Sequence, residues 1–162
     1  MNFVKTTSCI LAIMLASLFS CTDTKKVDDS KSIKTVNGLK SVKDKVVGEF
    51  GADKLVYSTT IMAKDHMNDE FMYAGISFLE NGIDMTQDLT MLPEEKTNPA
   101  KSKTLQNTII LKNKQGAVAL KDLNFEEIAS KVKQAEAMIP VDYEDFHLYR
   151  WVYSVDNDNK IT

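Results

Sequence analysis

The dipeptide Asn81-Gly82 is the feature that most constrains how this chain can fold. Both central positions of a tight two-residue hairpin need positive φ, which Asn and Gly adopt most readily. An apolar run over residues 71–79 precedes the turn, and residues 83–91 follow it with alternating character. Such alternation predicts a strand with one dry and one wet face. The expected dry face carries Ile83, Met85, Leu89 and Met91, and the wet face carries Asp84, Thr86, Asp88 and Thr90.

Two segments carry apolar residues at the spacing of an amphipathic helix, residues 39–50 and 124–139. In the second segment, Asn124 is the expected N-cap, Glu127 completes a capping box, and Pro140 ends the helix. Residues rich in β-branched and aromatic side chains predict further strands over 55–62, 108–112, 117–121 and 146–155. The last of these strands is apolar on both faces, which is typical of a central strand rather than an edge.

These elements predict an α+β fold in which two amphipathic helices pack on a mostly antiparallel sheet of about six strands. With 162 residues, 43% of them hydrophobic, the chain has room for one ordinary domain. A faint similarity between residues 70–78 and 145–153, each following a helix, leaves open a tandem repeat of a helix and a meander. Only three residues follow the turn-like run 156–159, so the second copy of such a repeat would be incomplete.

The first 20 residues have the layout of a secretory signal peptide. Lys5 supplies the positive charge, and the apolar run over residues 9–19 is shorter than the about 20 residues that a transmembrane helix needs. The run ends in Leu18-Phe19-Ser20-Cys21, which resembles the lipobox of bacterial lipoproteins. This resemblance covers the first 21 residues and implies cleavage before Cys21, a diacylglycerol thioether on its sulfur and an acylated amine. The alternative is an ordinary secretory peptide that happens to end at a cysteine.

Lipidation of Cys21 implies a protein of the cell envelope that is anchored to a membrane. Thr22 follows the cysteine in place of the aspartate that retains some lipoproteins, so the outer membrane is the expected location, on either its periplasmic or its surface face. The second cysteine, Cys9, would leave with the signal peptide. The mature chain would then hold no free thiol, which excludes a disulfide framework, a zinc–thiolate site and a cysteine nucleophile.

Three regions follow from this interpretation: a signal peptide over 1–20, a flexible tether over 21–38, and a single α+β domain over 39–162. The tether is predicted from composition, because residues 22–38 carry seven charged side chains and only three apolar ones. Such a segment cannot bury enough apolar surface to offset the entropy lost on ordering.

The sequence offers no recognised catalytic pattern: GxGxxG, GxxxxGK[ST], HExxH and GxSxG do not occur in it. Neither His66 nor His147 has serine or carboxylate neighbours at a catalytic spacing. The net charge is −3 and Arg150 is the only arginine, which argues against nucleic acid as a partner. We therefore predict a non-enzymatic binding or interaction module without a cofactor. Its expected partners are the membrane, through the lipid on Cys21, and a protein of the envelope.

The strand over 146–155 supplies the candidate binding residues. Its alternation places Tyr149, Trp151 and Tyr153 on one face and Arg150 on the other. Aromatic side chains with polar tips suit an interface or a flat ligand, so Tyr149, Arg150, Trp151 and Tyr153 are the candidates. Two alternatives stay open. The aromatic face packs beneath a helix, with Arg150 in a salt bridge at the sheet margin, or the strand is an open edge that a partner chain completes.

A second candidate function is a carrier of a soft metal or a small molecule, built on the methionine-rich hairpin. Thioether and imidazole groups are the soft ligands that suit Cu(I). Against this, methionine on the dry face of a strand is an ordinary filler of hydrophobic cores. The side chains in question are Met62, His66, Met67, Met72, Met85 and Met91.

Overall fold

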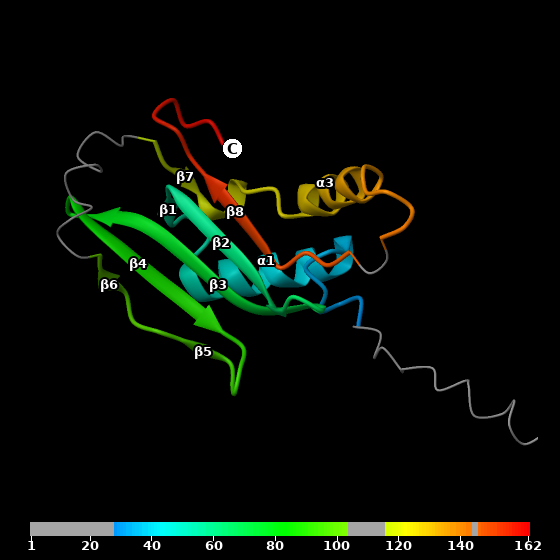
Figure 1. Ribbon diagram of the computed structural model, residues 1–162. Helices are drawn as coiled ribbons and strands as arrows, with labels where there is room; N and C mark the ends of the chain where they lie inside the picture. The colour runs from blue at the N-terminus through cyan, green and yellow to red at the C-terminus, as the bar shows by residue number, and fades with distance from the viewer. Residues whose placement is uncertain (1–27, 104–115, 144–145) are drawn as a thin grey trace, which may run out of the picture.

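The computed structural model describes residues 28–103, 116–143 and 146–162. Over these residues, two α-helices pack on a mostly antiparallel, open sheet (Figure 1). This arrangement confirms the predicted α+β class. No helix in the described part of the chain has both the length and the apolar character needed to cross a membrane.

The helices are α1 (Val36–Phe50) and α3 (Glu126–Glu136), and a 3-10 turn, η2 (Leu120–Asp122), precedes α3. The strands are β1 (Leu55–Val56), β2 (Ser58–Asp65), β3 (Asn68–Glu80), β4 (Ile83–Thr90), β5 (Lys96–Thr97), β6 (Lys101–Ser102), β7 (Val118–Ala119) and β8 (Arg150–Ser154). The six-stranded sheet has the order β5-β4-β3-β2-β8, with β6 also paired to β4. A separate two-stranded pair joins β1 to β7.

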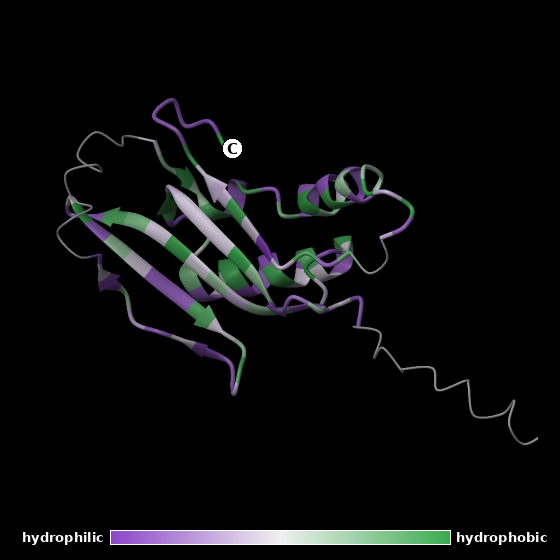
Figure 2. Cartoon of the chain, viewed as in Figure 1, coloured by the Kyte–Doolittle hydropathy of each residue, from purple (hydrophilic) through white to green (hydrophobic). Residues whose placement is uncertain are grey.

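The hairpin of β3 and β4 turns at Asn81-Gly82 as predicted, with φ of 52° and 76° at these residues. Leu89, on the expected dry face of β4, is fully buried, and bands of hydrophobic and hydrophilic residues alternate along this strand in Figure 2. Asp84 contradicts the predicted pattern, because it is buried although it belongs to the expected wet face. The side chain of Tyr57 hydrogen-bonds to Asp84 and accounts for its burial.

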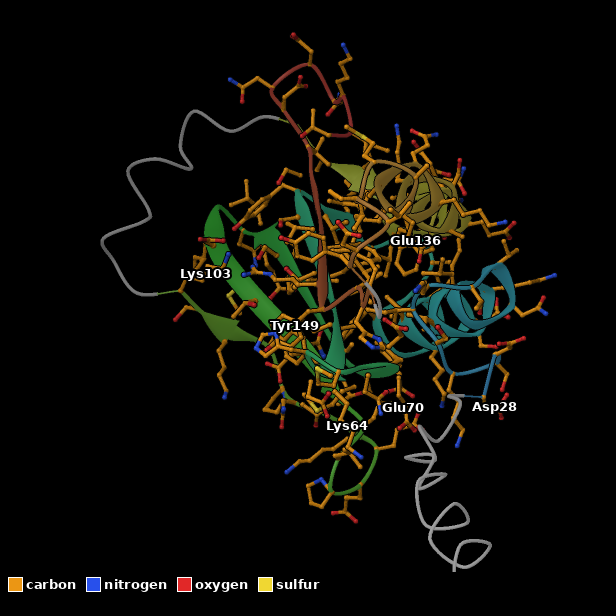
Figure 3. All side chains as sticks on the ribbon, turned by 45° about the vertical axis from the view of Figure 1, so that its right-hand side comes forward. Asp28, Lys64, Glu70, Lys103, Glu136 and Tyr149 are labelled. Atoms are coloured by element: carbon orange, nitrogen blue, oxygen red, sulfur yellow. The ribbon has the colours of Figure 1, made fainter. Side chains whose placement is uncertain are left out.

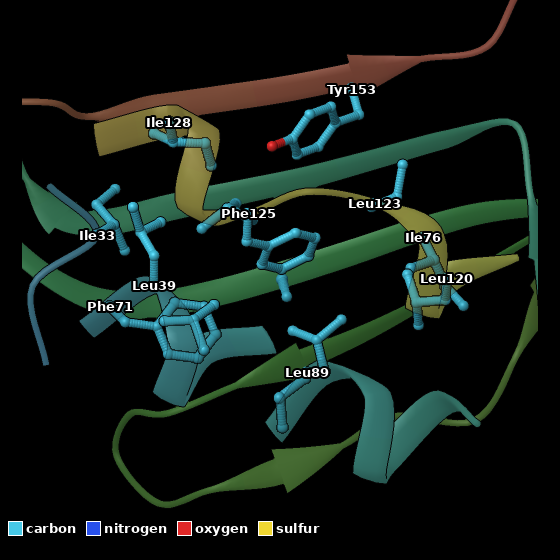
Figure 4. Packing of buried hydrophobic residues seen from close by; sticks show 14 of the residues in the cluster. Ile33, Leu39, Phe71, Ile76, Leu89, Leu120, Leu123, Phe125, Ile128 and Tyr153 are labelled. Atoms are coloured by element: carbon cyan, nitrogen blue, oxygen red, sulfur yellow. The ribbon is translucent and has the colours of Figure 1, made fainter. Parts of the chain in front are cut away.

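One hydrophobic core fills the space between the sheet and the two helices (Figure 4). The strands contribute alternate residues from a single face of the sheet, and α1 contributes residues three or four positions apart. This face-specific pattern explains why both described helices pack on the same side of the sheet. The largest fully buried side chains are Phe78, Phe125, Ile33, Leu39, Ile61, Ile76, Leu89, Leu120, Leu123 and Ile128.

The folded domain begins before the predicted boundary at residue 39. The amide of Ile33 donates to the carbonyl oxygen of Asp69 at 2.8 Å, and the amide of Phe71 donates to that of Lys31 at 2.8 Å. Residues 31–33 therefore pair with the start of β3 in an antiparallel bridge. Ile33 is fully buried within the core.

The predicted tether over 21–38 is therefore wrong for residues 28–38, while residues 21–27 lie outside the described part of the chain. Composition averages over a segment, and it hid the fact that one apolar side chain, Ile33, meets the core. Helix α1 also begins three residues earlier than expected. The hydroxyl of Thr35 caps it by accepting a hydrogen bond from the amide of Gly38 at 3.2 Å.

The second helix is shorter than the expected 124–139, and its predicted capping box is wrong. Its N-cap is Phe125, which has helical φ and ψ and makes no side-chain capping bond. The predicted strand over 108–112 lies outside the described residues. The run over 93–104 contains the short strands β5 and β6, which pair with β4.

The last strand is also placed differently from the prediction. Strand β8 covers Arg150–Ser154 and lies beside β2 at the end of the described sheet order, rather than at its centre. Its two apolar faces have another cause, because one face packs on the core and the other carries the half-exposed Val152. The structure shows no tandem repeat: α1 precedes a meander, whereas α3 is followed by β8 alone among the described strands.

Two glycines of α1 provide a matched test of how residues 29–32 pack on the helix. A Cβ at Gly38 would collide with the carbonyl oxygen of Ser32 and lie 2.8 Å from that of Asp29, whereas a Cβ at Gly48 would meet no atom within 4 Å. We expect Gly38→Ala to lower the free energy of unfolding by about 1–3 kcal/mol. Gly48→Ala should raise it by about 0.5–1 kcal/mol. Urea unfolding measures both, and equal gains for the two variants would contradict the packing of residues 29–32 against α1.

Candidate binding cleft

The aromatic residues of β8 face the core rather than an open surface. Tyr153 is buried, its ring stacks on Phe125 with centroids 5.8 Å apart, and its hydroxyl donates to the carbonyl oxygen of Asn124 at 2.6 Å. Burial raises the pKa of the Tyr153 hydroxyl, and the charge of Glu127 adds to the effect. Trp151 packs on the same core and is half-buried. Of the two alternatives for this face, the burial of Tyr153 and the partial burial of Trp151 support the one in which it packs beneath a helix.

The other two candidate residues have different neighbours. Tyr149 precedes β8, and its ring centroid lies 4.1 Å from that of His66. Arg150 is exposed. It is paired with Met62 of the neighbouring strand β2 and lies on the face of the sheet opposite the helices. The four predicted binding residues therefore do not form one surface. The backbone of Ser154 exchanges two hydrogen bonds with Thr162, at 2.9 and 2.8 Å, so the C-terminal residues pair with one end of β8.

The methionines of the proposed carrier site are likewise distributed over different surfaces. Met85 and Met91 pack against the core between sheet and helices, whereas Met62 lies on the opposite face. Met67 lies in the β2–β3 turn and is 73% exposed. Met62, Met67 and the pair of Met85 and Met91 therefore lie on different parts of the surface and core. Within the described residues, no group of three or more His, Cys, Asp or Glu side chains could hold a metal ion.

A cleft of about 250 Å³ opens at the end of the sheet where β2 turns into β3. Three parts of the fold form it: the segment before α1, the first half of α1, and the adjoining ends of β2, β3 and β4. Its apolar floor consists of Val42, Phe71 and Met91, and the 49% exposed Leu92 also lines the cleft. Val42 and Phe71 belong to the hydrophobic core, so the cleft reaches the core from outside.

Charged side chains surround this floor. Lys31, Lys45, Lys64 and Glu70 line the cleft, and Figure 3 shows Lys64 and Glu70 at the end of the molecule where Asp28 also lies. The ammonium group of Lys45 contacts both carboxylate oxygens of Glu95 at 2.8 Å. Neither Lys31 nor Lys64 forms an ion pair with another described residue. Lys31 and Lys64 are thus two exposed lysines that line the cleft without an ion-pair partner among the described residues.

The cleft could not be recognised in the sequence, because the residues that form it come from distant segments. Its lysines come from positions far apart in the chain, and Lys31 belongs to the segment expected to be a tether. The nearest signal of the cleft in the sequence was the apolar residue Ile33. Its burial in the core, together with the backbone pairing of residues 31–33 with β3, places Lys31 at the rim. The residues that line the cleft provide apolar contact, the hydroxyls of Ser30 and Ser41, and charged side chains of both signs.

A polar cluster on the opposite face of the sheet was also missed. The ammonium group of Lys103 lies 2.8 Å from the Tyr57 hydroxyl and 2.7 Å from the Ser77 hydroxyl. The Tyr57 hydroxyl in turn bonds to the buried carboxylate of Asp84. Burial raises the pKa of Tyr57, and the bond to Asp84 adds to the rise. These contacts join the start of β2 to β3 and β4, so the cluster has a structural role.

His147 has a structural role of the same kind. Its Nδ1 lies 3.2 Å from the carboxylate of Asp69, and the other oxygen of that carboxylate accepts the amide of Leu148 at 2.8 Å. The pair therefore holds the segment before β8 against the start of β3.

Comparison with known proteins gives no match: no family model, no curated protein and no solved structure is significantly similar to this chain.

The polar cluster can be tested with two tyrosine variants. Tyr57→Phe removes the hydroxyl that bonds to the buried Asp84, so we expect the free energy of unfolding to fall by about 1–3 kcal/mol. Tyr143→Phe removes a hydroxyl from a side chain that is 73% exposed and should change stability by less than about 0.5 kcal/mol. Urea unfolding followed by Trp151 fluorescence measures both. Equal effects of the two substitutions would show that the cluster does not stabilise the fold.

Proposed function

We propose that this chain is a lipid-anchored, non-enzymatic binding protein of the cell envelope, and that its binding site is the cleft beside α1. The observation that carries the proposal is the position of the cleft relative to Cys21. Ser30 and Lys31 line the cleft, and only six residues separate Cys21 from Asp28, where the described domain begins.

This short connection limits how far the cleft can lie from the anchor. Seven Cα–Cα steps from Cys21 to Asp28 span at most about 25 Å when fully extended. A lipid on Cys21 would therefore keep the cleft near the bilayer surface, at the membrane-proximal end of the domain. Such tethering raises the effective concentration of a site toward anything held in the same membrane. The outer membrane remains the expected location.

The chemistry of the cleft supports binding rather than catalysis. Its residues provide apolar contact and an excess of positive over negative side chains, and the Ser30 hydroxyl at its edge donates to the exposed carboxylate of Asp28 at 2.9 Å. The two histidines of the chain lie elsewhere, His66 against Tyr149 and His147 against Asp69. Binding of a ligand or a partner in this cleft requires no proton transfer by either histidine.

The anchor is tested by labelling cells with an alkyne-bearing palmitate and comparing two serine variants. We expect the wild-type protein to incorporate the label and to remain with the membrane fraction. Cys21→Ser should lose both properties, because the hydroxyl cannot take the thioether and the chain is not processed as a lipoprotein. Cys9→Ser is the matched control and should retain the label, since Cys9 precedes the expected cleavage point. Absence of label from the wild-type protein, or its retention by Cys21→Ser, would contradict the anchor.

A further inference from the structure

We propose that the cleft binds a small anionic amphiphile, a carboxylate or phosphate group on a short apolar chain. This inference deepens the proposed function by naming a ligand class for its site. The recognition chemistry lies entirely within residues 31–92 and does not require the lipid on Cys21, so the two proposals can fail separately.

The floor of the cleft selects the apolar part of the ligand. Val42 and Phe71 are 2% and 7% exposed, and Met91 packs beside them on the core. Methionine adapts its shape to an apolar group more readily than branched residues do. The volume of about 250 Å³ equals that of about eight water molecules, at about 30 Å³ each. The site therefore has room for a short apolar chain.

The rim selects the charge of the ligand. Three lysines, Lys31, Lys45 and Lys64, and one carboxylate, Glu70, line the cleft, so positive side chains outnumber negative ones there on a chain whose net charge is −3. Glu95 neutralises Lys45, whereas Lys31 and Lys64 have no ion-pair partner among the described residues. A single anionic group above the apolar floor would contact these two amines while its chain displaces water below. A cationic ligand would be repelled by them.

The acyl chains of Cys21 itself are the competing occupant. The connection from Cys21 to Ser30 is long enough to reach the cleft, and acyl chains match the apolar floor. They carry no negative charge, so they would leave Lys31 and Lys64 without partners. The two ammonium groups therefore favour a separate, anionic ligand.

The test uses the full mature chain, residues 21–162, with Cys21→Ser so that no lipid is attached. Three probes are titrated: octanoate, 1-octanol with the same chain but no charge, and acetate with the charge but almost no chain. The readout is the ¹³C-methyl resonance of Met91 in the floor, assigned with Met91→Leu. The methyl resonance of Met138, which is 84% exposed and lies outside the cleft, reports nonspecific effects. We expect octanoate to shift Met91 at the lowest concentration, octanol more weakly, and acetate not at all.

A matched pair of lysine variants separates the rim from general charge. Lys31→Gln/Lys64→Gln should weaken octanoate binding about tenfold and leave octanol binding unchanged. Lys133→Gln/Lys160→Gln removes the same charge from surface positions outside the cleft and should leave octanoate binding as in the parent. All four lysines are surface side chains, and thermal unfolding checks that each variant is folded. Equal binding of octanoate and octanol, or equal effects of the two double variants, would overturn the proposal.

Two further arms identify the source of the amphiphile and its relation to the anchor. The same chain is sedimented with vesicles of phosphatidylcholine alone or with phosphatidylglycerol added. If the chain is retained on the anionic vesicles and Lys31→Gln/Lys64→Gln abolishes this retention, the ligand is a membrane lipid. If the chain binds octanoate but is not retained on the vesicles, the ligand is a free amphiphile. If the lipidated protein shows Met91 already shifted and no longer responsive to octanoate, the occupant is the chain's own lipid and the proposal fails. If only palmitate labelling fails, the anchor is wrong while the cleft chemistry stands.

Discussion

The antiparallel bridge between residues 31–33 and the start of β3 is the interaction on which the rest of the site depends. Its two hydrogen bonds, Ile33 to Asp69 and Phe71 to Lys31, are both 2.8 Å long. They bury Ile33 in the core and at the same time place Lys31 at the rim of the cleft. Without the bridge, the N-terminal wall of the cleft and the capped start of α1 would have no fixed position. This one pairing therefore fixes the packing of Ile33 in the core, the start of α1 and the place of Lys31 in the cleft.

The sheet divides the molecule into two chemically different sides. The covered side is a dry core shared by α1, α3 and alternate residues of the strands, and it includes the aromatic residues of β8. The side opposite the two described helices holds polar contacts such as the cluster of Tyr57, Asp84 and Lys103. The cleft lies where the covered side ends, so apolar floor and charged rim meet there. A site that combines the two characters can form at this margin without burying an unpaired charge.

Local patterns predicted those parts of the fold that local chemistry determines. Asn81-Gly82 specified the hairpin because few residues adopt positive φ, and apolar spacing specified α1. The edge position of β8 could not be predicted, since a strand covered by helices has the same apolar composition as a central one. The cleft could not be predicted either, because Lys31 and Lys64 come to line one cleft only through the pairing of residues 31–33 with β3. Pairing between segments that are distant in the sequence, rather than residue type, determines both the position of β8 and the formation of the cleft.

Amide hydrogen exchange at Ile33 and Phe71 tests the central claim most directly, because these two amides donate the bonds of the bridge. The account predicts that both exchange only through global unfolding, with protection that matches the amides of β3 paired with β4. Exchange of the Ile33 amide at the rate of an open surface segment, while β3 stays protected, would show that residues 28–35 detach from the domain. The wall of the cleft and the short connection to the anchor would then both be lost.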